Sequence, residues 1–174
     1  MKTINTERLI LLPLSMEYCS EEYLNWLNDP EVYKFLETRG NQNMEMLKDF
    51  IENQIKNKVA IWAITLKSSG KHIGNIKIDP INFKHGFGEY GILMGEKNEW
   101  GKGYAKEASI GVIDYFFNEI NLRKITLGVV RQNTQAVALY EKLGFVTEGI
   151  YKEHLVYDGI YYDVLRMSLF NKNR

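Results

Sequence analysis

The fold is decided by Tyr90-Gly-Ile-Leu-Met-Gly-Glu-Lys-Asn-Glu-Trp-Gly-Lys-Gly-Tyr-Ala105. This stretch begins as an apolar run typical of a strand, passes through a polar loop, and ends where an amphipathic helical pattern begins. The first N–H groups of a helix lack partners within the helix, and the helix dipole adds partial positive charge there. Gly101 and Gly103 would let an anion approach the backbone closely. The stretch therefore predicts a phosphate or pyrophosphate site.

Two other phosphate-binding motifs are excluded by spacing or by context. The P-loop pattern G-x-x-x-x-G-K-[ST] does not occur in the sequence. The dinucleotide pattern G-x-G-x-x-G does occur, at residues 86–91. Residues of strand character follow it, whereas a dinucleotide site needs a helix at that place. For Gly101 and Gly103 taken alone, an ordinary turn before a helix stays open as the alternative.

Composition indicates one globular domain, residues 1–174, without a broad charged surface. The chain is 45% apolar, and its 174 residues can bury a sizeable core. Lys plus Arg and Asp plus Glu number 22 each, which gives no support for a nucleic-acid partner. Cys19 is the single cysteine, so a disulfide framework and a multi-cysteine metal site are excluded, and we expect no metal. No secretory signal or membrane-spanning run occurs, and we expect a cytoplasmic protein without a membrane partner.

Periodicity and turn residues predict an α+β domain with a mixed central sheet flanked by helices. Strands are expected over residues 8–14, 59–66, 72–81, 89–94, 124–130, 145–157 and 160–169. Helices are expected over residues 20–27, after Pro30, over 44–58, from Tyr104, and over 133–143. The helix over 44–58 should bury a stripe formed by Leu47, Phe50, Ile51 and Ile55. Gly144 suits a left-handed position after a helix, and Asp158-Gly159 suits a hairpin turn.

Two motifs in this order resemble the GNAT superfamily of N-acetyltransferases. Gly101-Lys-Gly-Tyr-Ala105 resembles its acetyl-CoA pyrophosphate loop, and Asn133-Thr-Gln-Ala-Val-Ala-Leu-Tyr-Glu-Lys-Leu-Gly-Phe145 resembles its next motif. Thr6-Glu-Arg-Leu-Ile-Leu and Trp26-Leu-Asn-Asp-Pro-Glu-Val32 resemble the branch of ribosomal-protein N-terminal, amino-sugar and small-amine acetyltransferases. The superfamily usually has Gln or Arg three residues before the first glycine, where this chain has Asn98.

The resemblance implies that acetyl-CoA is the co-substrate and that main-chain groups hold it. The pyrophosphate would be bound by backbone N–H groups of Trp100, Gly101, Lys102, Gly103, Tyr104 and Ala105. Leu93 and Met94 would bond the pantetheine arm as an added strand. Asn133 would cap its helix and also bond the arm. The Lys102 ammonium would add charge, with a solvated surface position as the alternative.

The resemblance makes Tyr140 the general acid. It lies two helical turns after Asn133, so both side chains fall on nearly the same helix face. A phenol with a pKa of ~10 stays protonated at neutral pH and can donate to the departing sulfur. The alternative is a core aromatic residue without a chemical role.

The general base is less determined by the sequence. Peptide-acetylating relatives can have a glutamate five residues before the motif asparagine, and this chain has Gly128 there. We expect Glu89 to act instead, directly or through water, because it shares a strand face with Gly91 and Leu93. An exposed strand-end acid, His154 as the base, or solvent are the alternatives.

The acceptor is expected to be a primary amine on a small molecule, such as an amino sugar or sugar nucleotide. Gly128 disfavours the peptide reading, and four tyrosines of the C-terminal hairpin could stack on a sugar: Tyr151, Tyr157, Tyr161 and Tyr162. His154 and Asp163 are the expected acceptor-binding residues, with structural roles as the alternative. A protein N-terminus as acceptor, a non-catalytic acyl-CoA-binding module, and a monomer or a homodimer all stay open.

Overall fold

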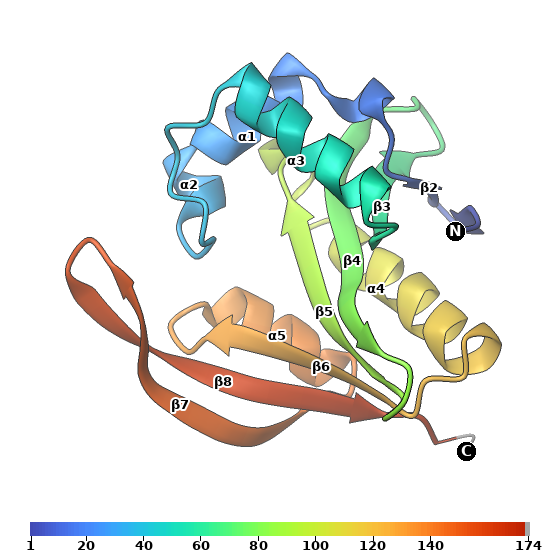
Figure 1. The fold of residues 1–174 in the computed structure, drawn as a ribbon, viewed down its shortest axis with the longest axis vertical. Coiled ribbons are helices and arrows are strands. Elements are labelled where there is room, and N and C mark those ends of the chain that lie inside the picture. The colour runs from blue at the N-terminus through green and yellow to red at the C-terminus, as the bar shows by residue number, and fades with distance from the viewer. Residues whose placement is uncertain (173–174) are drawn as a thin grey trace. The chain divides into compact units, whose positions relative to one another are not determined.

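The computed structural model describes residues 1–172 and confirms the α+β class with a mixed sheet (Figure 1). Eight strands form the sheet in the order β1-β2-β3-β4-β5-β6-β8-β7. The strands are β1 (Ile4–Asn5), β2 (Leu9–Pro13), β3 (Ala60–Leu66), β4 (His72–Asn82), β5 (Phe87–Met94), β6 (Lys124–Val130), β7 (Val146–Tyr157) and β8 (Ile160–Phe170). The helices are α1 (Glu21–Asn28), α2 (Pro30–Tyr33), α3 (Met44–Lys56), α4 (Tyr104–Asp114) and α5 (Thr134–Lys142). Short turns η1 (Met16–Tyr18) and η2 (Lys97–Glu99) are 3-10 helices, and η3 (Tyr115–Glu119) is a π-helix that follows α4.

Contacts divide the chain into two compact units, and each is described by itself. Unit 1 comprises Met1–Asp79 and Gly91–Val112, and unit 2 comprises Pro80–Tyr90 and the chain from Ile113 onward. Strands β4 and β5 and helix α4 contribute residues to both units. The expectation of a single domain stays a prediction. Within residues 1–172, no helix is long and apolar enough to cross a membrane.

Helices α1, α2 and α3 of unit 1 each begin at a short polar capping residue. Ser20 Oγ accepts a hydrogen bond from the Tyr23 N–H at 3.2 Å, and Asn43 Oδ1 accepts one from the Met46 N–H at 2.9 Å. Asp29 caps α2, in which Pro30 is the first residue. Short polar side chains thus satisfy N–H groups that the helices leave unpaired.

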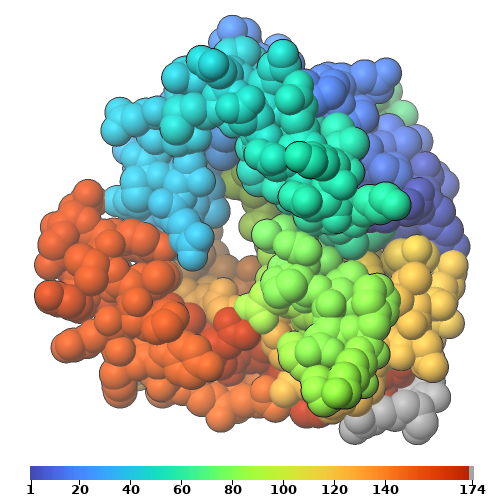
Figure 2. All heavy atoms as spheres, viewed as in Figure 1, coloured from blue at the N-terminus to red at the C-terminus, as the bar shows by residue number. Residues whose placement is uncertain are grey.

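Helices α1 to α3 form a continuous layer in unit 1, as Figure 2 shows in blue to teal. Leu47 and Ile51 of α3 are buried in one cluster with Ile61 and Ala63 of β3. The predicted stripe of α3 is wrong in two of its four residues, Phe50 and Ile55, which are 39% and 45% exposed. They lie on either flank of the line from Leu47 to Ile51, and only that line faces the sheet.

Helix α4 packs closely against the N-terminal strands of unit 1. An added Cβ at Gly111 would lie 3.0 Å from Thr6 Cγ2 and 3.3 Å from Ile4 Cγ2. The glycine therefore permits a short distance between α4 and the segment that joins β1 and β2. This approach brings the first turn of α4 next to Thr6 and Arg8.

Unit 2 contains a parallel strand pairing. Strand β5 pairs with β6 from Phe87↔Lys124 to Glu89↔Thr126, and β6 and β7 each pair antiparallel with β8. The G-x-G-x-x-G pattern lies at the start of β5 and within it, so the strand expected at Ile92–Met94, in place of a helix, is confirmed. Gly144 has φ +92° after α5, and Asp158 and Gly159 have φ +52° and +77° in the hairpin turn, as predicted.

Gly95 lies directly against the indole ring of Trp26. An added Cβ would be 1.9 Å from Trp26 Cδ2, so Gly95→Ala must displace the ring or α1. We expect the free energy of unfolding, measured in urea, to fall by about 1–3 kcal/mol, the usual cost of overpacking. The control is Gly149→Ala, whose Cβ would meet nothing within 4 Å. Equal losses of stability in the two variants would contradict the close contact.

Candidate active site

The loop before α4 has the backbone conformation that its glycines predict. Gly101 and Gly103 have φ angles of +75° and +84°, which side chains other than glycine rarely adopt. The Glu107 N–H donates to the Gly103 carbonyl at 3.1 Å in the first turn of α4. The N–H groups of Tyr104 and Ala105 come before this bond, at the positions where a helix leaves its donors unpaired. This loop offers main-chain donors to an anion.

Two main-chain groups predicted to bind the carrier are already engaged within unit 1. The Trp100 N–H donates to the Lys97 carbonyl at 3.1 Å and closes η2. The Trp100 indole Nε1–H donates to the Met94 carbonyl at 3.0 Å. Trp100 thus joins the end of β5 to the loop. The donors that remain for a ligand lie further along, from Gly101 to Ala105.

Two lysines of the loop are ion-paired. Lys97 Nζ lies 2.7 Å from Asp29 Oδ2 and 3.0 Å from Glu31 Oε1, and its hydrogen bond lowers the pKa of Asp29. Lys102 Nζ lies 2.8 Å from Glu99 Oε2, and this hydrogen bond raises the pKa of Lys102. The predicted charge of Lys102 is therefore balanced by a carboxylate three residues away. Such exposed pairs contribute little stability, and a ligand phosphate could compete for either lysine.

Two residues of the N-terminal Thr6-Glu-Arg8 sequence form hydrogen bonds with the first turn of α4. Glu107 Oε1 accepts hydrogen bonds from Thr6 Oγ1 at 2.6 Å and from the Arg8 N–H at 2.7 Å. Glu107 Oε2 accepts from Arg8 Nε at 2.7 Å. Burial raises the pKa of Glu107, but these hydrogen bonds outweigh it and hold the pKa below its usual value. Sequence reasoning missed this contact, because it joins residues about a hundred positions apart.

Tyr140 lies in the core of unit 2. It is 7% exposed and packs against Tyr90 and Phe145, at ring-centroid distances of 5.7 and 6.0 Å. Burial raises the pKa of Tyr140 to about 12, so the phenol stays protonated throughout the neutral range. At the start of α5, Asn133 Oδ1 accepts from the Ala136 N–H at 3.3 Å, which confirms its capping role. Both motif side chains are thus held firmly by their own unit.

Glu89 is paired with a cation that sequence reasoning missed. Arg166 Nη1 and Nη2 each lie 2.7 Å from a Glu89 oxygen, and Thr126 Oγ1 donates to Glu89 at 2.5 Å. The pair raises the pKa of Arg166. The guanidinium passes over Gly128, the register partner of Arg166, where a Cβ would lie 2.7 Å from Nη1. Gly128 therefore leaves room for the Arg166 guanidinium.

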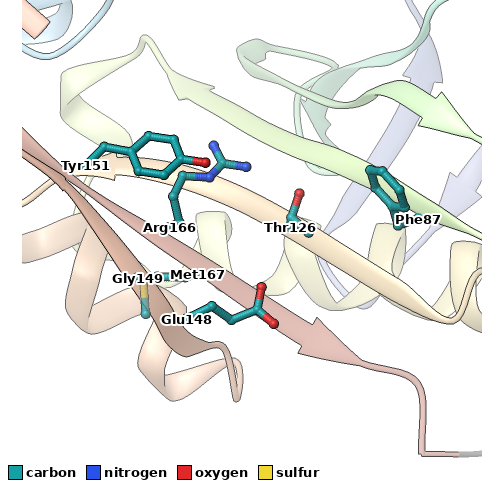
Figure 3. Close-up of a pocket in the computed structure, with 7 residues that line it drawn as sticks. All are labelled: Phe87, Thr126, Glu148, Gly149, Tyr151, Arg166 and Met167. Atoms are coloured by element: carbon teal, nitrogen blue, oxygen red, sulfur yellow. The ribbon is translucent and has the colours of Figure 1, made fainter. Parts of the chain in front are cut away.

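A pocket of about 300 Å³ opens beside this ion pair in unit 2 (Figure 3). Its lining consists of Phe87, Thr126, Glu148, Gly149, Tyr151, Arg166 and Met167. The Arg166 guanidinium lies 5.9 Å from the centre of the Tyr151 ring at one end of the pocket. Glu148 is paired with Lys124 at 2.6 Å. The pocket therefore combines an aromatic wall with charges that are already balanced.

The predicted acceptor-binding residues have structural contacts of their own. Asp163 Oδ1 accepts from the Glu153 N–H at 3.0 Å, and Oδ2 lies 3.0 Å from Lys152 Nζ. These two bonds lower the pKa of Asp163 and fix the irregularity of β7, where Glu153 has φ +47°. His154 is exposed and lies 4.9 Å from the Tyr151 ring. His154 thus contacts a residue of the pocket wall, Tyr151.

The comparison with protein families agrees with this geometry. A family model described as acetyltransferase (GNAT) domain matches residues 8–146, which include both motifs. The chain belongs to the GNAT acetyltransferase family. It is thus an N-acetyltransferase, and the predicted superfamily is confirmed. Within residues 1–172, no group of three or more His, Cys, Asp or Glu side chains could hold a metal ion.

Relatives of this GNAT chain include enzymes with a stated substrate. The N-acetyltransferase p20 of Bacillus licheniformis, itself uncharacterized, is 31% identical over 99% of this chain and 98% of its own. The spermidine N(1)-acetyltransferase of Vibrio cholerae is 40% identical over 56% of each chain. The solved structure of a Vibrio cholerae spermidine N-acetyltransferase with CoA and spermine has a TM-score of 0.85 at 27% identity, covering 94% of this chain and 96% of that one. A GNAT acetyltransferase structure from Bacillus anthracis, at 21% identity and a TM-score of 0.87, covers 98% of this chain and 99% of that one and shows the same fold. None of these names refers to an amino sugar.

Proposed function

We propose that this protein transfers an acetyl group from acetyl-CoA to a primary amine of a small molecule by direct attack. The glycine loop before α4 carries the proposal. Its two glycines with positive φ and its helix-start N–H groups suit a pyrophosphate, which needs several donors and no Cβ in the way. A solved relative that binds CoA, at 27% identity, supports the same ligand.

Residues 101–105 bind the pyrophosphate in this proposal, and Leu93 and Met94 guide the pantetheine arm through main-chain groups. The Met94 carbonyl already accepts from the Trp100 indole and the Leu93 carbonyl lies against Gly74 of β4, so the other main-chain groups of these residues would bond the arm. Asn133 contributes its Nδ2–H donors, which remain while Oδ1 caps α5.

Tyr140 stabilises the departing sulfur in this proposal. A thiol has a pKa of ~8.5, well below that of the buried phenol, so a complete proton transfer to the thiolate is uphill. The hydroxyl therefore acts first as a hydrogen-bond donor to the sulfur as negative charge develops. If the proton of the Tyr140 hydroxyl is then transferred to the sulfur, the hydroxyl also acts as the general acid.

The acceptor is a small primary amine in this proposal, and spermidine is the first to test because three relatives are named spermidine N(1)-acetyltransferases. Fewer tyrosines are placed to stack on a sugar than the sequence analysis expected. Tyr157 is 8% exposed, and Tyr161 and Tyr162 lie outside the pocket lining, which leaves Tyr151 as the tyrosine of the pocket wall. The charges of Glu148 and Arg166 are balanced by Lys124 and Glu89, so charge alone does not select a polyamine over an amino sugar.

The proposed function is tested by an acceptor panel. Spermidine, spermine, glucosamine and a peptide with a free N-terminus are each incubated with acetyl-CoA and the purified protein, and free thiol is measured. We expect thiol release with a small amine, above the rate without acceptor. Release with the peptide alone would contradict the small-molecule acceptor. CoA binding without release for any amine would instead indicate an acyl-CoA-binding module.

Tyr140→Phe keeps the ring and its packing but removes the donor to sulfur. We expect kcat to fall by roughly 10²-fold or more, with little change in the Kd of acetyl-CoA. Rapid-quench kinetics on the best acceptor measure the chemical step. Tyr23→Phe is the matched control, because Tyr23 is also buried, at 3% exposure, but belongs to neither motif. Undiminished kcat in Tyr140→Phe would remove the hydroxyl from the reaction.

Glu89 is the proposed base, and its pair with Arg166 must open or pass the proton through water. Glu89→Gln should lower kcat/KM at neutral pH, and the loss should shrink as pH rises towards the pKa of the amine, because less acceptor then needs deprotonation. Glu148→Gln, a change of the other paired carboxylate, is the control and should show no such pH dependence. An equal loss at every pH would assign Glu89 to orientation, and no loss would leave solvent or His154 as the base.

A further inference from the structure

We infer that Arg8 is a positioning residue for acetyl-CoA, because it sets the direction of the Gly103 N–H in the pyrophosphate loop. The inference rests on the proposed function, since it concerns the same loop. It adds a residue from the N-terminal segment, about a hundred positions away from the motif that it controls. All the contacts that carry it lie within unit 1.

Arg8 contacts the loop and the first turn of α4 through separate groups. Its Nη1 donates to the Lys102 carbonyl at 3.0 Å, and its Nε donates to Glu107 at 2.7 Å. The guanidinium also lies 4.5 Å from the centre of the Tyr104 ring. One planar group thus contacts three residues of the loop–helix junction, Lys102, Tyr104 and Glu107. A guanidinium can do this because its donors point in fixed, different directions.

The bond to the Lys102 carbonyl determines where the next N–H points. The carbonyl of Lys102 and the N–H of Gly103 belong to one planar trans peptide, so they point in opposite directions. Because Arg8 holds the carbonyl towards itself, the Gly103 N–H points away from Arg8. Gly103 also lies close to the guanidinium, since an added Cβ would be 3.6 Å from Arg8 Nη2. Arg8 therefore contacts one side of the loop and directs the Gly103 N–H to the opposite side.

Glu107 in turn fixes Arg8. Its carboxylate is 15% exposed and accepts from the Arg8 N–H, from Arg8 Nε and from Thr6 Oγ1. Since the same carboxylate lies in the first turn of α4, the helix start and Arg8 cannot move independently. Without Arg8, the peptide between Lys102 and Gly103 would be free to rotate about its glycine, where both signs of φ are allowed. Donors would then have to be ordered when the ligand binds, which costs affinity.

The test compares CoA with pantetheine, which has the same arm but no pyrophosphate. Calorimetry gives the Kd of CoA, and ligand-observed NMR gives the weaker Kd of pantetheine. Arg8→Ala should weaken CoA by about fivefold or more, the worth of about one hydrogen bond, and leave pantetheine unchanged. The CoA affinity of Arg8→Lys should lie between those of the wild type and Arg8→Ala, because an ammonium has no planar set of donors. Lys71→Ala is the control. The Lys71 side chain is 44% exposed, like that of Arg8, and pairs with Glu96 at 2.7 Å. Within residues 1–172, no hydrogen bond from Lys71 to a carbonyl of the pyrophosphate loop is found.

The outcomes separate this inference from the proposed function. Wild-type protein that binds no CoA would overturn the proposed function itself. Wild-type binding with an unchanged CoA affinity in Arg8→Ala would overturn the role of Arg8 alone. An equal loss for CoA and pantetheine would also overturn it, because it would indicate a general structural effect. If thermal melting shows that Arg8→Ala is unfolded, Arg8→Lys decides by the same comparison.

Discussion

The loop that opens α4 depends on one carboxylate. Glu107 is mostly buried, and a buried charge must be hydrogen-bonded to be tolerated. Its partners are Thr6 and Arg8, so the charge draws the N-terminal segment onto the helix start. Gly111, one turn further along α4, makes room for this approach next to Thr6. The glycines allow the loop to adopt its conformation, and contacts with residues outside the loop stabilise it.

In unit 2 as well, a glycine leaves space for a charged side chain. Gly128 has no side chain, and the Arg166 guanidinium occupies the space above it and reaches Glu89 on the next strand but one. The glutamate of peptide-acetylating relatives, placed at Gly128, would meet that guanidinium. A side chain at this position would require the end of the Arg166 side chain to move. In this chain, Glu89 of β5 lies beside the pocket and is accompanied by its own cation, Arg166.

Features set by neighbouring residues could be predicted from the sequence. The caps Ser20 and Asn133, the turn at Asp158 and Gly159, and the positive φ of Gly101 and Gly103 all follow from local chemistry. The pairings of Arg8 with Glu107 and of Glu89 with Arg166 could not, because strand order and register bring these residues together. Asp163 shows the same limit: its carboxylate is used in a β7 irregularity that no local pattern indicates. Family resemblance located the candidate site, but the groups that hold it became visible only in the fold.

The most direct test of this account follows the amide resonances of Gly101 and Gly103 by NMR as CoA is added. Their N–H groups should shift and gain protection from hydrogen exchange, because each is expected to bond a pyrophosphate oxygen. The amides of Gly70 and Gly159 also have positive φ, at +70° and +77°, and serve as controls that should not change. CoA binding that leaves Gly101 and Gly103 unchanged would contradict the account.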